Sequence, residues 1–96
     1  MVSLYTPGVL FLSDIDMKEI EFKMEINYPH IVPGAEVDVE ESELQGGLVV
    51  YYTIVPAIAM SGNFKRRDAL KELHGTVKSV REGNGGGWYV LVSFPE

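Results

Sequence analysis

Four basic side chains that could bind an anion gather in one short stretch of the sequence. Residues 1–64 hold ten acids against two lysines, a balance of −8, whereas residues 65–96 hold four acids against six bases, a balance of +2. An arginine guanidinium can bind a phosphate through two parallel hydrogen bonds. The cluster therefore leaves two interpretations open: a nucleotide or anion site built on Arg66, Arg67 and Lys71, or the commoner arrangement, a solvated helix face.

The spacing of other reactive side chains predicts neither a metal site nor a cofactor. His30 and His74 lie in unrelated segments, and no cysteine is present to complete a zinc site with them. We expect His30 in a turn and His74 at a helix C-terminus, where the helix dipole favours its charged form. Asp14 and Asp16, with Glu19, lack the longer ligand series and central glycine of a calcium loop, so they are interpreted as a turn.

Catalysis and nucleic-acid binding are not supported either. No serine or threonine has a local signature for a neighbouring, oriented base. The carboxylates of Glu21 and Glu25 belong to the wet face of a predicted strand, where their acidity should be ordinary. We therefore expect a protein that is not an enzyme.

Aromatic and basic residues near the C-terminus invite comparison with proteins that stack single-stranded bases. The candidates are Tyr51, Trp88 and Tyr89, with Lys78 and Arg81. The net charge of −6 opposes binding to a polyanion, and Trp88 is expected in the core. Packing is therefore the preferred interpretation, and no nucleic-acid binding is expected.

Composition indicates one domain, residues 1–96, with a single core. The hydrophobic fraction is 46%, and a chain of this length buries enough surface for one core. The absence of cysteine suits a reducing compartment. The apolar run 9–12 is far shorter than the roughly 20 residues of a membrane helix, so we expect a cytoplasmic protein without membrane contact.

The clearest structural pattern is a β-hairpin at the C-terminus. Thr76–Glu82 and Trp88–Phe94 flank a glycine-rich loop, and the second segment alternates strictly. Its inward side chains, Trp88, Val90, Val92 and Phe94, should form one wall of the core. Val77 and Val80 have opposite parity, which predicts either a β-bulge between them or the partial exposure of one of them.

Earlier segments also predict strands. Val9–Ser13 is a short candidate, and Ile20–Tyr28 alternates with its apolar residues on one face until Pro29 stops it. Pro33-Gly34 favours a type II turn. Another half-buried strand then begins at Val37 and Val39.

The segment Leu48–Met60 is apolar almost throughout, so a strand there would be hydrophobic on both faces. We expect the face carrying Val49, Tyr51 and Val55 to be covered by a helix or by a partner subunit. Pro56 cannot donate a ladder hydrogen bond, which indicates that regular pairing stops nearby and that the strand lies at an edge.

Residues 64–73 are predicted to form a short α-helix. Ser61-Gly62-Asn63 offers N-cap chemistry, and Gly75 suits the C-terminal end. Its apolar stripe is thin, so it should cap the strands at one edge. The predicted fold is mainly β: a small antiparallel β-barrel of about six strands with this one helix.

Three segments, taken in order, resemble a PilZ domain. They are Gly8–Ser13, Val32–Val39, and His74–Val77 together with Trp88–Phe94. The resemblance spans most of the chain and implies a six-stranded barrel with a role in bacterial signalling through cyclic di-GMP, or in assembling motility and pilus machinery.

The residues that bind cyclic di-GMP in such domains have no counterpart here. Those domains carry Arg-x-x-x-Arg before the first strand, whereas no arginine precedes Arg66, and of Asp/Asn-x-Ser-x-x-Gly only Gly8 is matched. We therefore predict a PilZ-like regulatory or adaptor module that acts through protein contacts along Leu48–Met60, with a protein partner or as a homodimer. The alternative is the nucleotide or anion sensor that uses the basic stretch.

Overall fold

The structure is a computed structural model that describes residues 17–96. Seven strands form one antiparallel sheet: β1 (Met17–Met24), β2 (Glu36–Leu44), β3 (Val49–Ile54), β4 (Ala59–Ser61), β5 (Phe64–Lys65), β6 (His74–Glu82) and β7 (Trp88–Pro95). The mainly β fold is therefore confirmed. The expected strand Val9–Ser13 and the acids Asp14 and Asp16 lie outside the described residues.

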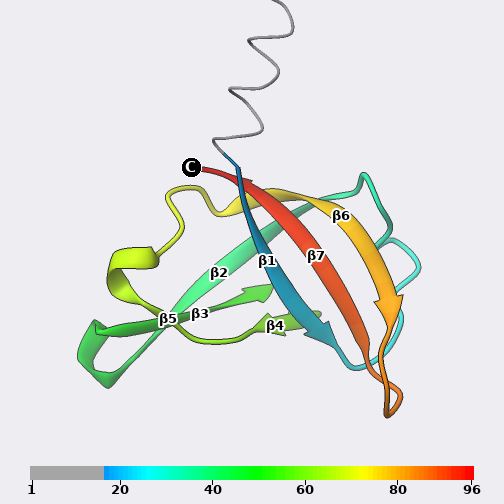
Figure 1. Ribbon diagram of the computed structural model, residues 1–96, viewed down its shortest axis with the longest axis horizontal. Coiled ribbons are helices and arrows are strands. Elements are labelled where there is room, and N and C mark those ends of the chain that lie inside the picture. Colours follow the sequence, from blue (N-terminus) through cyan, green and yellow to red (C-terminus); the bar gives the residue numbers. More distant parts are fainter. Residues whose placement is uncertain (1–16) are drawn as a thin grey trace, which may run out of the picture.

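The sheet closes into a ring, as Figure 1 shows. The strand order is β2-β6-β7-β1-β4-β3-β5, and β2 pairs with β3 as well as with β6. Closure depends on β2, whose first residues, 36–38, pair with β6, while residues 39–44 pair with β3. The long strand β2 thus joins β6 to β3 and closes the ring.

Alternation places one face of each strand in the core. On β1, Ile20, Phe22 and Met24 are buried, and Phe22 packs against Phe94 with ring centroids 6.2 Å apart. On β7, Val90, Val92 and Phe94 are buried, while Trp88 is half-buried and packs against the core. The predicted core wall of the last strand is confirmed.

Two predicted turns and the bulge are also confirmed. The β6–β7 pairing shifts register between Val77 and Ser79, and residues 83–87 connect the two strands as a hairpin loop. At Pro33-Gly34, the Ala35 N–H donates to the Val32 carbonyl at 2.9 Å, and Gly34 has a φ of 93°. That positive φ is the one a type II turn requires at its third residue.

Strand β1 ends earlier than the alternation of residues 20–28 predicts. β1 stops at Met24, and Ile26 is 60% exposed. The reason is the lack of a partner, because Met24 pairs with Trp88, where β7 begins, and with Ala59, where β4 begins. Within residues 17–96 no strand is available beyond Met24 to continue the ladder.

The predicted α-helix at residues 64–73 is wrong. Phe64 and Lys65 form β5, which pairs with β3, and only the 3₁₀ turn η2 (Arg66–Asp68) follows. Ala69 is already extended, with φ −63° and ψ 151°. His74 consequently begins β6 instead of ending a helix. A second 3₁₀ turn, η1 (Gln45–Gly47), joins β2 to β3.

The apolar segment Leu48–Met60 folds as two strands and a turn. Regular pairing of β3 stops at Ile54, just before Pro56, as predicted. The predicted edge position is wrong, since β3 lies between β2 on one side and β4 and β5 on the other. Pro56 is tolerated because it lies in the turn between β3 and β4.

Among residues 17–96 no helix has the length and apolar character needed to cross a membrane.

Candidate protein-interaction surface

The two faces of β3 differ sharply in burial. Val50, Tyr52 and Ile54 are fully buried, whereas Val49, Tyr51 and Thr53 are half-buried and point outward. Val55, just beyond the strand, is also half-buried. The structure therefore places the predicted interaction residues Val49, Tyr51 and Val55 outside the core, on or next to one strand.

Neighbouring elements extend this outward surface. Leu44 at the end of β2 is 39% exposed, Leu48 is 69% exposed, and Met60 on β4 is 52% exposed. We call the set Leu44, Leu48, Val49, Tyr51 and Met60 the outer apolar face. Such exposure means that no described segment covers it, and clustered exposed apolar residues are typical of binding surfaces.

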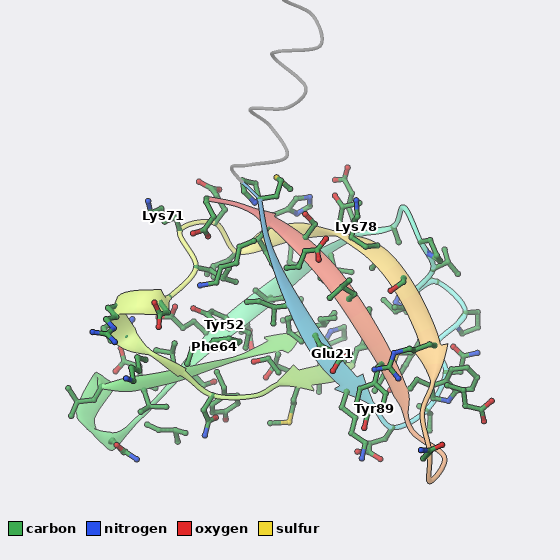
Figure 2. The ribbon with its side chains drawn as sticks, in the orientation of Figure 1. Glu21, Tyr52, Phe64, Lys71, Lys78 and Tyr89 are labelled. Carbon is green, nitrogen blue, oxygen red and sulfur yellow. The ribbon has the colours of Figure 1, made fainter. Side chains whose placement is uncertain are left out.

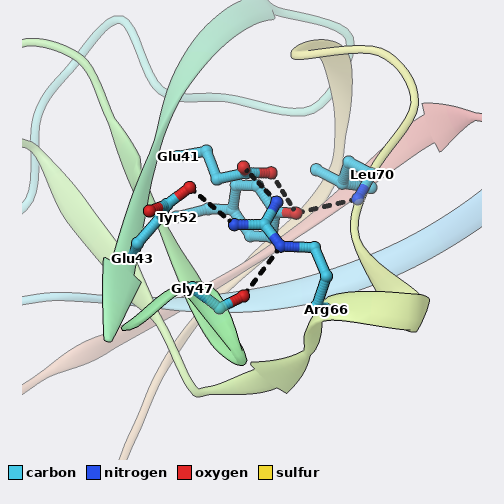
Figure 3. A network of polar contacts seen from close by, with 6 residues as sticks. All are labelled: Glu41, Glu43, Gly47, Tyr52, Arg66 and Leu70. Atoms are coloured by element: carbon cyan, nitrogen blue, oxygen red, sulfur yellow. Dashed lines mark hydrogen bonds and ion pairs between the residues drawn. The ribbon is translucent and has the colours of Figure 1, made fainter. Parts of the chain in front are cut away.

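A network of hydrogen bonds links β2, η1 and η2 near the inward-facing side chains of β2 (Figure 3). The Arg66 guanidinium donates to Glu41 Oε2 at 2.9 Å, to Glu43 Oε2 at 2.8 Å and to the Gly47 carbonyl at 2.9 Å. Glu41 and Glu43 share the inward parity of β2, and η2 brings Arg66 to them. The network joins β2, η1 and η2.

Tyr52 carries this network into the core. Its hydroxyl donates to Glu41 Oε1 at 3.0 Å and accepts from the Leu70 N–H at 2.8 Å (Figure 3). Burial, followed by the hydrogen bond and charge of Glu41, raises the pKa of Tyr52 above its ordinary value, while the Leu70 N–H acts in the opposite direction. The hydroxyl thus stays protonated and able to donate.

The basic stretch does not form the predicted helical anion site. Arg66 is engaged by two carboxylates, so an anion must compete with Glu41 and Glu43 for it. Arg67 and Lys71 are exposed, and Figure 2 shows Lys71 on the irregular segment that follows η2. Residues 64–73 form no α-helix, so Arg66, Arg67 and Lys71 are not aligned on one helix face.

His74 lies between two acids on β2. Its Nδ1 is 2.8 Å from Asp38 Oδ1, and its Nε2 is 2.7 Å from Glu36 Oε1. Asp38 and His74 are direct cross-strand partners in the β2–β6 pairing. The hydrogen bond with Asp38, then that with Glu36, raises the pKa of His74 above its ordinary value of 6.5.

We expect His74 to titrate with a midpoint above 6.5 in the folded protein. The sign follows from linkage: the charged ring stabilises the fold fully below the unfolded-state pKa, and this contribution is lost as pH rises through the raised folded-state pKa. An NMR titration of the His74 ring measures the midpoint, and Asp38→Asn with Glu36→Gln should lower it. A wild-type midpoint at or below 6.5 contradicts the pairing.

The aromatic residues considered for base stacking are not brought together. Arg81 lies over the Tyr89 ring at 4.6 Å and pairs with Glu21, on the β1–β7–β6 side of the ring (Figure 2). Tyr51 is on β3, separated from β7 by β4 and β1 in the sheet. Trp88 faces inward, so these side chains form no common platform.

Further candidate sites are weak within residues 17–96. No group of three histidine or acidic side chains in that part of the chain could hold a metal ion. A shallow hollow of about 320 Å³ lies between β1 and the β3–β4 turn, with Lys23, Glu25 and Met60 in its lining. Its two charges have opposite sign, so it favours neither anions nor cations.

The alternation of inward and outward residues in the sequence indicates two members of the polar network, Glu41 and Tyr52. Glu41 follows Val37 and Val39 at the same inward spacing, and Tyr52 lies in a run with buried parity. Buried tyrosine hydroxyls usually have a hydrogen-bond partner. The sequence does not say that Arg66 completes the arrangement.

Fold and surface together define a small, mainly β protein whose closed sheet exposes an apolar patch on one side. No protein-family model, curated protein sequence or solved structure matches the chain.

Proposed function

We propose that this protein is a non-enzymatic interaction module that binds a protein partner through the outer apolar face. The observation that carries the proposal is the outward position of Val49 and Tyr51 on β3, a strand whose other face is fully buried. Leu44, Leu48 and Met60, on the segments around this strand, are exposed as well. Burying such a surface against another protein is favourable because it removes apolar area from water. A tyrosine is also a common centre of binding energy at protein interfaces.

The chemistry of the described residues supports binding over catalysis. The groups with a displaced pKa are Tyr52, Arg66 and His74, and each is held by hydrogen bonds that join strands or turns. These hydrogen bonds explain the displaced pKa values and indicate that the three side chains have a structural role. As a regulatory or adaptor module, the protein would act by holding partners together.

Tyr51→Glu is expected to weaken partner binding without unfolding the protein. A charge at the centre of the outer apolar face must be desolvated on binding, so affinity should fall at least about 30-fold, the equivalent of about 2 kcal/mol. Light scattering measures self-association, and pulldown followed by titration measures binding to other proteins. The side chain points outward, so thermal melting should change little.

Leu91→Glu is the matched control. Leu91 is a half-buried, outward residue on β7, on the other side of the ring. It receives the same charge but should leave binding intact. The proposal fails if Tyr51→Glu changes neither the solution mass nor the binding of any captured partner.

A further inference from the structure

A row of four outward side chains crosses the sheet at the border of the outer apolar face. The register places Glu40 on β2 beside Thr53 on β3, Thr53 beside Met60 on β4, and Met60 beside Lys23 on β1. Neighbouring strands are about 4.8 Å apart, so the two ends of the row are about 14 Å apart when measured along the curved sheet. Among the described residues neither Glu40 nor Lys23 has an ion-pair partner.

We propose that the partner of this face is a second copy of the chain, related by a two-fold axis that runs parallel to β3 and passes between Thr53 and Met60. The inference rests on the proposed function and names its partner. Rotation about that axis keeps each row level and exchanges its two ends. Glu40 of each copy then faces Lys23 of the other, so two ion pairs form for each dimer.

The same axis gives the other outward residues suitable contacts. Val49 meets the Lys65 side chain of the second copy, whose aliphatic stem can cover it. Tyr51 meets the connection at Gly62 between β4 and β5. An added Cβ at Gly62 would have no atom within 4 Å, so there is room for the tyrosine ring. Met60 packs across the axis against Thr53.

Pairing of two copies along the free edge of β2 is disfavoured by charge. The edge of β2 over residues 40–44 faces away from β3, and antiparallel self-pairing centred on Ser42 would place Glu41 opposite Glu43 of the second copy. Like charges directly opposite each other destabilise a strand pair, and charged edge residues discourage such pairing. The row on the outer apolar face carries an acid at one end and a base at the other, so its charges complement those of a second copy. The charges on the β2 edge do not.

The test is a charge exchange followed by sedimentation equilibrium of the full chain at about 150 mM salt, where the Debye length is roughly 8 Å. Wild type is expected to reach twice the chain mass of 10.7 kDa as concentration rises. Glu40→Lys and Lys23→Glu should each raise the dissociation constant at least about tenfold, because each creates two like-charge contacts. Both residues are exposed, so melting curves should match wild type.

An equimolar mixture of the two variants should recover the dimer, since one copy then carries two lysines and the other two glutamates at the facing positions. The double variant, Glu40→Lys with Lys23→Glu, should recover it as well. Failure of both rescues overturns the two-fold arrangement. A wild-type mass of 10.7 kDa at every concentration overturns self-association, and if Tyr51-dependent binding of another protein is still found, the proposed function survives without it.

Discussion

Gly75→Ala is expected to lower the free energy of unfolding by about 3 kcal/mol, the upper part of the range for overpacked interiors. Gly75 is buried on β6, and an added Cβ would lie 2.7 Å from the Ser93 carbonyl oxygen and 2.8 Å from the Phe94 ring. The oxygen cannot move away easily, because β7 pairs with both β1 and β6. Urea unfolding and thermal melting measure the loss, which corresponds to roughly 15 °C in Tm.

Gly62→Ala provides the comparison for this change. Gly62 is exposed, has no atom near the position of an added Cβ, and should tolerate alanine within about 0.5 kcal/mol. The two variants make the same chemical change, so their difference isolates the close approach of β6 to β7. Equal stability of the two variants would contradict the packing of Gly75 against Phe94.

Features that depend on local periodicity could be predicted from the sequence. The β6–β7 hairpin, its bulge and the Pro33-Gly34 turn are all set by side chains within a few positions of one another. The inward wall of β7 follows from a period of two. The outward position of Tyr51 was not predictable on this ground, because the segment Leu48–Met60 is apolar on both faces; the structure shows that Val50 and Tyr52 are the buried ones.

Features that depend on contacts between distant segments could not be predicted. Residues 64–73 include good helix formers, yet Phe64 pairs with Val50, and Arg66 is held by Glu41, 25 positions earlier in the chain. These tertiary contacts override a weak local preference for helix. The early end of β1 has a similar origin, because it reflects where the remote partner strands β4 and β7 begin.

The interaction surface shows the same division. Parity places Val49 and Tyr51 on one side of β3, but the row from Glu40 to Lys23 exists only through the register of four strands. A one-residue slip in any of these pairings would turn a member of the row inward. Val49 and Tyr51 were thus assigned to one face from the sequence, whereas the exposure of Leu44, Leu48 and Met60 and the charge pattern of the face required the sheet.

The interpretation of the basic stretch also changes once contacts between distant segments are known. In sequence it resembles an anion site, but Arg66 lies against two acids that belong to β2. Arginine suits this position because its planar fork can donate to two carboxylates and a carbonyl at once. Lysine at this position could not reproduce that geometry, which supports a structural role for Arg66 in holding η2 against the β2–β3 hairpin.

Tyr52→Phe is expected to lower the free energy of unfolding by about 1 to 3 kcal/mol, although it removes a single oxygen. Phenylalanine keeps the ring packing, including the contact with Phe64 at 6.1 Å between centroids. The buried Leu70 N–H, however, loses its acceptor, and Glu41 loses one of its donors. Urea unfolding measures the cost, and hydrogen exchange at the Leu70 amide should become faster.

Tyr51→Phe separates this network from the interaction surface, because the two tyrosines are adjacent in sequence but point to opposite faces of β3. It should leave stability within about 0.5 kcal/mol of wild type, since Tyr51 is half-buried and, within residues 17–96, its hydroxyl forms no hydrogen bond. Tyr52→Phe should conversely leave self-association unchanged at temperatures well below its melting point. Unaltered exchange at Leu70 in Tyr52→Phe would mean that the tyrosine hydroxyl does not accept that hydrogen bond, and that other contacts hold residues 66–70: those of Arg66, the bond from Lys18 to the Asp68 carbonyl and the burial of Leu70.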